Sequence, residues 1–251
     1  MPFAFVSVEE AIARHGLRMV VIGGVPSPWG EAAKGILHIK KIDWVAARLS
    51  YDNEALREWA GGRSGPIAIY DHEPPRAGWA EILLLADRLA PTPSLIPADA
   101  AERAMMFGLA HEICGEDGLG WTRRLRMIDA GAFGPRVSQY LARKYGHTPV
   151  TAAAAATRVP SLLRMLAVRL AAQRTAGSPY YIGGSPTAVD VYSATFMALF
   201  RPLPIEQCAM DDAIRSAFAM PDPQTDAALD PILLEHRDMM YARHLELPLS
   251  L

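Results

Sequence analysis

Ser27 is the residue of this chain whose predicted position best suits chemistry. It follows a glycine-containing turn and precedes Pro28, an order that is typical of a helix N-cap and a first helical residue. The start of a helix has unpaired amide donors and a partial positive charge, and both favour an anion that lies next to this end of the helix. A thiolate is such an anion. The local motif fits equally a serine that only caps the helix.

The elements around Ser27 alternate between strand and helix. From apolar runs, β-branched residues and turn residues, the predicted strands occupy residues 17–22, 44–49, 66–70 and 75–77. The predicted helices occupy residues 28–40, 52–59 and 79–89, and Asp52 is the expected cap of the second. This order predicts two parallel strands joined through a helix, then a hairpin and a closing helix.

The rest of the chain is predicted to be helical. A proline-rich linker at 91–97 separates the two parts, and the predicted helical stretches are 98–114, a broken 118–145 and 161–176. We expect Pro160 to start the last of these rather than to interrupt it. Residues 148–156 fit either a helix or a linker. In Tyr180–Val191, Thr187 and Asp190 have the spacing of a capping box before an apolar helix.

The order strand, turn, Ser27-Pro28-Trp29-Gly30, helix resembles the first unit of the thioredoxin fold as glutathione transferases use it. The Tyr-x-x-Gly-x-x-x-Thr-x-x-Asp element ending at Asp190 resembles their helical domain. The resemblance implies an N-terminal extension at 1–16, a thioredoxin-like glutathione-binding domain at 17–90, a linker at 91–97 and an all-helical domain at 98–251. It further implies a cytoplasmic homodimeric enzyme of detoxification that joins glutathione to a small electrophile.

The same resemblance assigns roles to individual residues. Ser27 would stabilise the glutathione thiolate, and Trp29 belongs to the same cofactor-binding segment. Pro66 would follow a cis peptide bond, so that the backbone of Gly65 meets the cysteinyl part of glutathione. Where the family has an acid–serine pair for the γ-glutamyl end, this chain has Arg76-Ala77-Gly78-Trp79. Arg76 and the amides near Gly78 are the groups left to meet that carboxylate, although Arg76 fits a solvated surface charge equally well.

We expect Ser27 to lower the pKa of the glutathione thiol. A free thiol has a pKa of about 8.5, so only a few per cent is thiolate at neutral pH. A hydrogen bond to the charged sulfur contributes roughly 1.5–3 kcal/mol and the helix start about 0.3–1 kcal/mol. At about 1.4 kcal/mol per unit, the thiol pKa falls by roughly one to three units.

Composition argues against other function classes. The net charge of −2, with lysine and arginine scattered along the chain, gives no footprint for nucleic acid or an acidic membrane surface. The first residues lack a signal-peptide pattern, so we expect a protein of the cytoplasm.

Cys114 and Cys208 lie far apart and predict neither a disulfide framework nor a metal site. A thiol–disulfide oxidoreductase would need a cysteine near Ser27. The alternative left open is a transferase-like protein that binds ligands or partners without turnover.

Overall fold

The computed structural model describes residue 3 and residues 5–251. The strands are β1 (Phe5–Val6), β2 (Leu17–Val21), β3 (Trp44–Arg48) and β4 (Ile67–Tyr70). The helices of the first part are α1 (Val8–Ala13), α2 (Pro28–Ile39), α3 (Glu54–Ala60) and α4 (Trp79–Leu89). Those of the second part are α5 (Ala100–Cys114), α6 (Leu119–Asp129), α7 (Pro135–Tyr145), α8 (Pro149–Thr175), α9 (Ala188–Phe196), a 3₁₀ turn (Met197–Leu199), α10 (Asp212–Phe218), α11 (Pro223–Ala228) and α12 (Pro231–Arg243). None of the helices described is both long and apolar enough to cross a membrane.

The first part is a small mixed sheet in the order β1-β3-β2-β4. Strands β2 and β3 are parallel, with Met19 opposite Ala46, and β4 runs antiparallel to β2, with Ala68 opposite Met19. This topology confirms the predicted thioredoxin-like arrangement followed by a helical part. The predicted fourth strand at 75–77 is wrong: Arg76 makes only an isolated bridge with Ala68, because the chain turns into α4 two residues later.

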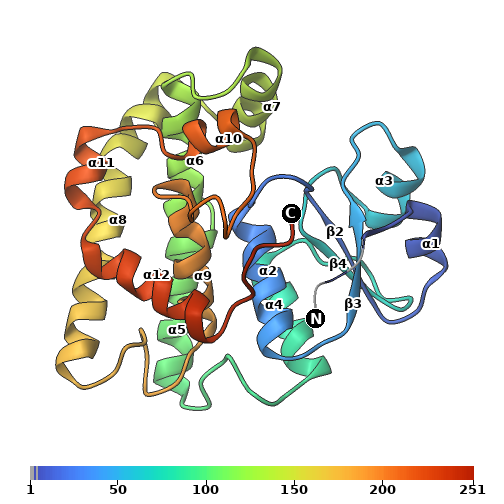
Figure 1. The fold of residues 1–251 in the computed structure, drawn as a ribbon, viewed down its shortest axis with the longest axis horizontal. Coiled ribbons are helices and arrows are strands. Elements are labelled where there is room, and N and C mark those ends of the chain that lie inside the picture. Colours follow the sequence, from blue (N-terminus) through green and yellow to red (C-terminus); the bar gives the residue numbers. More distant parts are fainter. Residues whose placement is uncertain (1–2, 4) are drawn as a thin grey trace.

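Helices cover both faces of this sheet. The alternation of side chains along each strand sends Met19 and Ala46 to the face that packs on α2 and α4. Val20 and Ala47 point to the other face, which α1 and α3 cover. Figure 1 shows α2 and α4 between the sheet and the helices of the second part. Helix α2, which begins just after Ser27, is therefore buried from two sides.

The N-terminal extension belongs to the sheet. Phe5 and Val6 pair in parallel with Ala46 and Ala47 and so protect the outer edge of β3. Ser7 caps α1, because its Oγ accepts a 3.1 Å hydrogen bond from the Glu10 amide. The limits of the two domains, set at 17–90 and 98–251 from the sequence, stay predictions.

Three predicted helix starts are wrong in detail. Asn53 and not Asp52 caps α3, since its Oδ1 accepts from the Leu56 amide at 2.8 Å. Helix α5 begins at Ala100 because Asp99 caps it. Pro160 lies inside α8 rather than at its start. A proline inside a helix costs about 3 kcal/mol, but the alanine run before it has the highest helix propensity and Pro160 itself is buried, so one 27-residue helix forms.

The capping motif at Thr187 and Asp190 is confirmed, with an added partner. The Asp190 carboxylate is fully buried and accepts hydrogen bonds from the Thr187 amide at 2.8 Å and the Tyr181 amide at 2.9 Å. The Thr187 hydroxyl donates to the same carboxylate at 2.9 Å instead of accepting from the Asp190 amide. His236 of α12 lies 3.0 Å away. This carboxylate therefore joins α9 to the last helix of the fold.

Candidate functional site

Ser27 is the N-cap residue of α2, as predicted. Its carbonyl accepts the first helical hydrogen bond from the Glu31 amide at 2.8 Å, and Pro28 occupies the first helical position. The prediction that its hydroxyl caps the helix is wrong, because the side chain accepts no capping hydrogen bond. The residue is 8% exposed. The hydroxyl is thus not committed to the helix, but little of the residue reaches solvent.

The Gly65–Pro66 peptide bond is cis, which confirms that expectation. Gly65 lies against the end of β2: a Cβ on it would come within 3.2 Å of the Val20 carbonyl oxygen. The turn that leads to Ser27 begins at the same end of β2. The turn before Ser27 and the segment at Gly65, which are far apart in the sequence, therefore lie at the same end of strand β2.

An apolar pocket opens beside Pro66. Its walls come from α2, the segment around α4 and α9, and it is lined by Trp29, Ala33, Ile36, Pro66, Ala77, Trp79, Ile82 and Tyr192. The Tyr192 hydroxyl donates to the Trp79 carbonyl oxygen at 3.2 Å. The free space among these side chains is about that of one water molecule, so in this conformation it is a packing gap beside Trp29 and Pro66 and not a ligand-sized site.

Trp29 is directed toward the helical part of the molecule. Its ring meets Phe196 edge to face with the centroids 4.8 Å apart, and it lies close to Gly120. A Cβ at Gly120 would lie 2.3 Å from the Phe196 ring and 2.9 Å from the Trp29 ring, so only glycine fits there. Trp29 thus fixes the start of α2 against α6 and α9.

The two groups expected to meet the γ-glutamyl carboxylate are occupied by carboxylates of the chain itself. Arg76 Nη2 lies 2.6 Å from Glu73 Oε2, and Arg88 also donates to Glu73. These hydrogen bonds, first that of Arg88 and then that of Arg76, lower the pKa of Glu73. The Gly78 amide donates to Glu81 Oε2 at 2.9 Å. A carboxylate ligand at this place would have to displace them.

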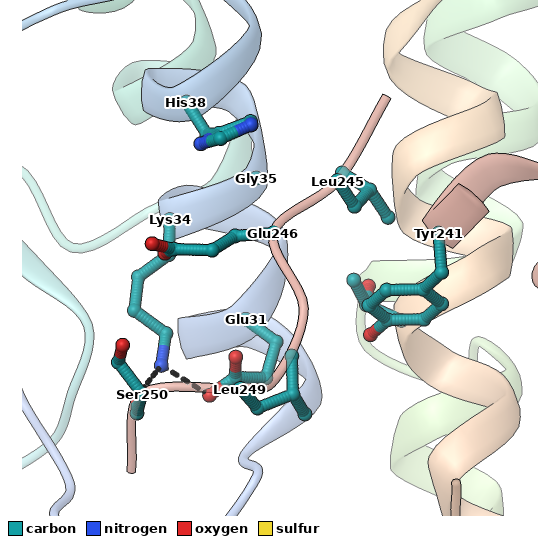
Figure 2. A pocket seen from close by; sticks show the side chains of 10 residues that line it. Glu31, Lys34, Gly35, His38, Tyr241, Leu245, Glu246, Leu249 and Ser250 are labelled. Atoms are coloured by element: carbon teal, nitrogen blue, oxygen red, sulfur yellow. Dashed lines mark hydrogen bonds and ion pairs between the residues drawn. The ribbon is translucent and has the colours of Figure 1, made fainter. Parts of the chain in front are cut away.

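The far side of α2 is covered by the C-terminal tail. Figure 2 shows Lys34 pointing toward Ser250, whose carbonyl oxygen accepts from Lys34 Nζ at 2.7 Å. The same ammonium lies 2.6 Å from Glu31 Oε1. Burial raises the pKa of Glu31, and the charge of Lys34 opposes this rise. This pocket of α2, α12 and the tail holds the helix that carries Ser27 but does not reach Ser27 itself.

Helix α7 contacts the segment before Gly65 through Tyr140, which the sequence offers as a pocket-lining or core residue, and through Lys144, which the sequence does not assign to the site. The Tyr140 hydroxyl donates to the Arg63 carbonyl oxygen at 3.3 Å, and Lys144 Nζ donates to Ser64 Oγ at 2.6 Å. Ser64 immediately precedes Gly65. The sequence carries one signal for this role: residues 135–145 contain three basic side chains and no acidic one.

Cys114 and Cys208 are buried, and burial raises the pKa of both thiols. Across residue 3 and residues 5–251 there is no group of three His, Cys, Asp or Glu side chains arranged to hold a metal ion.

The chain is similar to known proteins in its three-dimensional structure and not detectably in its sequence. No protein-family model matches the chain, and no curated protein matches its sequence. A glutathione S-transferase from Methylobacterium radiotolerans, solved with glutathione sulfonate, aligns over 90% of this chain and 91% of that one, with a TM-score of 0.61 and 15% identity. A glutathione S-transferase from Xanthobacter autotrophicus aligns over 94% and 98%, with a TM-score of 0.58 and 17% identity.

A third similar structure is a glutathione transferase family member from Pseudomonas fluorescens with two glutathione molecules bound. It aligns over 92% of this chain and 97% of that one, with a TM-score of 0.55 and 13% identity. Further similar structures come from the Tau, Omega and Zeta classes. The chain therefore has the fold of the glutathione S-transferase superfamily, without a preference for one of its classes.

Proposed function

We propose that this protein is a glutathione transferase in which Ser27 stabilises the thiolate of bound glutathione. The observation that carries the proposal is that Gly65 lies against the end of β2 from which the chain turns to Ser27 at the start of α2, and that Trp29 and Pro66 line one small pocket. The uncommitted Ser27 hydroxyl would donate to the sulfur, and the backbone of Gly65 would pair with the cysteinyl residue.

The chemistry would be nucleophilic attack by the sulfur. Hydrogen bonding by Ser27 and the helix start would lower the thiol pKa by roughly one to three units from about 8.5, so that between about a quarter and nearly all of the bound thiol is ionised at pH 7. The thiolate then forms a bond to an electrophilic carbon as the leaving group departs.

A second candidate is a protein that binds a ligand without turnover. Two observations favour it: Ser27 is only 8% exposed, and Arg76 and the Gly78 amide are both bound to glutamates of the chain. Such a protein would keep the fold and lose the thiolate chemistry.

Two measurements separate these candidates. Calorimetric titration with glutathione measures binding, and steady-state conjugation of 1-chloro-2,4-dinitrobenzene measures turnover, both for the wild type, Ser27→Ala and the control Ser161→Ala on the exposed face of α8. We expect Ser27→Ala to raise the pKa of the bound thiol and to lower kcat/KM at neutral pH at least tenfold. Equal activity of wild type and Ser27→Ala would refute the role of Ser27. Glutathione binding without turnover in the wild type would favour the second candidate.

A homodimer and a cytoplasmic location complete the proposal. Leu84 of α4 and Met105 of α5 are large apolar residues, 45% and 41% exposed. In a homodimer we expect Leu84 to lie in the contact with the second copy. Light scattering coupled to gel filtration tests this: we expect a dimer for the wild type and a monomer for Leu84→Lys.

A further inference from the structure

Helix α7 is held in place by far less burial than its neighbours. Of its 11 residues only Tyr145 is buried, whereas α6, which has the same length, has eight buried residues. Leu141 and Ala142 are partly buried against a small cluster formed with α6 and α8. Burial of apolar side chains is the main attraction that holds a helix to a protein, so α7 can leave its place at a lower free-energy cost than α6.

Glycines stand at both ends of α7. Gly131 before the helix and Gly146 after it have φ angles of +69° and +67°, in the left-handed region that other residues rarely adopt. Gly134 directly precedes the helix, and a Cβ there would have open space around it. Hinges are formed by a few loop residues that absorb a change in backbone angles. Both ends of α7 therefore suit hinges.

Three described contacts join α7 to the first part of the molecule. The Tyr140 hydroxyl donates to the Arg63 carbonyl oxygen at 3.3 Å, and its ring meets that of Tyr51 edge to face at 5.4 Å. Lys144 Nζ donates to Ser64 Oγ at 2.6 Å. Both hydrogen bonds are exposed, and no ion pair among the described residues joins α7 to the first part. Water can replace such partners, so these contacts break at little cost.

The contacts lie at the end of the sheet where the proposed site is. Ser64 directly precedes Gly65, and Tyr51 follows β3, whose end lies beside that of the parallel strand β2. The ring of Tyr145 lies 6.3 Å from that of Trp29, near the start of α2. Figure 1 shows α7 and α3, the helix between Tyr51 and Ser64, toward the same end of the molecule. Helix α7 therefore reaches from the second part to the loops of the first part at this site.

The place proposed for glutathione is closed in this structure. Ser27 is 8% exposed, Pro66 is buried, and the gap beside Trp29 and Pro66 has room for about one water molecule. Glutathione is a tripeptide, so part of the surrounding wall must move before it can bind. Among α2, α4, α6, α7 and α9, helix α7 has the fewest buried residues.

We propose that α7 is a lid over this site: it turns about the glycines at its ends to admit glutathione, and it closes through Tyr140 and Lys144 on the loops that carry Tyr51 and Ser64. This inference rests on the proposed glutathione transferase function for its ligand. The closed lid would exclude water from the Ser27 hydroxyl and the sulfur, which strengthens the hydrogen bond between them. The movement of the lid itself can be tested without glutathione.

Alkylation of the Ser27→Cys variant by iodoacetamide measures how often the site opens. The rate is followed by mass spectrometry in Ser27→Cys alone and in combination with Tyr140→Ala, Tyr140→Phe, Lys144→Met or Val168→Ala. Val168 is 69% exposed on α8 and serves as the control. Each second substitution is also measured without Ser27→Cys.

We expect Tyr140→Ala to raise the alkylation rate of Ser27→Cys about tenfold, because it removes both the hydrogen bond and the ring contact of the closed lid. Tyr140→Phe, which keeps the ring, and Lys144→Met should each raise the rate about threefold. Val168→Ala should leave it unchanged. Equal rates in all variants would overturn the proposal.

The native cysteines show whether a variant opens at α7 or unfolds as a whole. Cys114 and Cys208 are both buried, so without Ser27→Cys alkylation should stay slow in every variant. An equal rise at these two cysteines in both Tyr140→Ala and Lys144→Met would mean that the whole protein opens, and would overturn the lid.

Binding of glutathione, measured by stopped flow with Ser27 intact, separates the lid from the proposed function. We expect Tyr140→Ala to raise the association rate constant several-fold, because a larger fraction of the protein is open. Faster alkylation without glutathione binding in any variant would support the movement of α7 and count against the transferase. Glutathione binding to the wild type with equal alkylation rates in all variants would leave the transferase standing and overturn the lid.

Discussion

The indole nitrogen Nε1 of Trp29 lies 2.9 Å from the carbonyl oxygen of Cys114. Cys114 is the last residue of α5, and its carbonyl is one of those that a helix leaves without an internal partner. This hydrogen bond therefore ties the start of α2, and with it Ser27, to the break between α5 and α6.

Trp29→Phe tests this tie. The phenyl ring keeps much of the contact with Phe196 but removes the donor, so we expect the free energy of unfolding to fall by about 1 kcal/mol. Urea denaturation measures it. Trp44→Phe is the control, because Trp44 is held by stacking on Phe3 at 4.5 Å, which a phenyl ring preserves. If the free energy of unfolding falls equally in both variants, the loss comes from the smaller ring area and not from the missing hydrogen bond.

Lys40 holds the end of α2 to the linker. Its side chain is fully buried, and its Nζ atom lies 2.8 Å from Asp87 Oδ1, 2.8 Å from the Ala90 carbonyl oxygen and 2.9 Å from that of Pro93. Lys40→Met leaves these acceptors without their donor, so we expect a loss of about 3 kcal/mol in unfolding free energy. Lys41→Met, next to it but exposed, should change stability by less than about 0.5 kcal/mol. A small loss for Lys40→Met would show that water replaces the ammonium.

The Tyr51 hydroxyl should ionise at a higher pH than that of an ordinary tyrosine. Burial, followed by the charge of Tyr140 and a hydrogen bond with it, raises the pKa of Tyr51 from 10.0 to about 12. The phenolate absorbance that distinguishes the wild type from Tyr51→Phe should therefore appear near pH 12, and Tyr140→Phe should move it toward 10. Between these values the unfolded chain has lost the proton and the folded chain has not, so stability falls as the pH rises through this window. Titration of Tyr51 near pH 10 would contradict the contact with α7.

Glu73 competes with any ligand for Arg76. Glu73→Gln removes the charge that now holds Arg76, so if Arg76 meets the carboxylate of glutathione, the variant should bind glutathione several-fold more tightly. Calorimetric titration measures this, and Glu116→Gln on the exposed loop after α5 serves as control. An unchanged dissociation constant would assign Arg76 to the surface ion cluster with Glu73 and Arg88.

Local features of this chain were readable from its sequence. Strand and helix patterns, the position of Ser27 at a helix start and the capping motif at Thr187 and Asp190 all depend on residues within a few positions of one another. The wrong predictions are also local. Asp52 and Asn53 are neighbours and both have side chains that can cap a helix. The prediction that a helix starts at Pro160 did not take account of the high helix propensity of the alanines before it.

The partners of the site residues were decided by the tertiary structure. Trp29 meets Cys114 and Asp190 meets His236 across 85 and 46 residues, and Lys144 reaches Ser64 across 80. Periodicity along the chain says which face of an element is buried but not which atom of a distant element it meets, because that depends on how the helices pack.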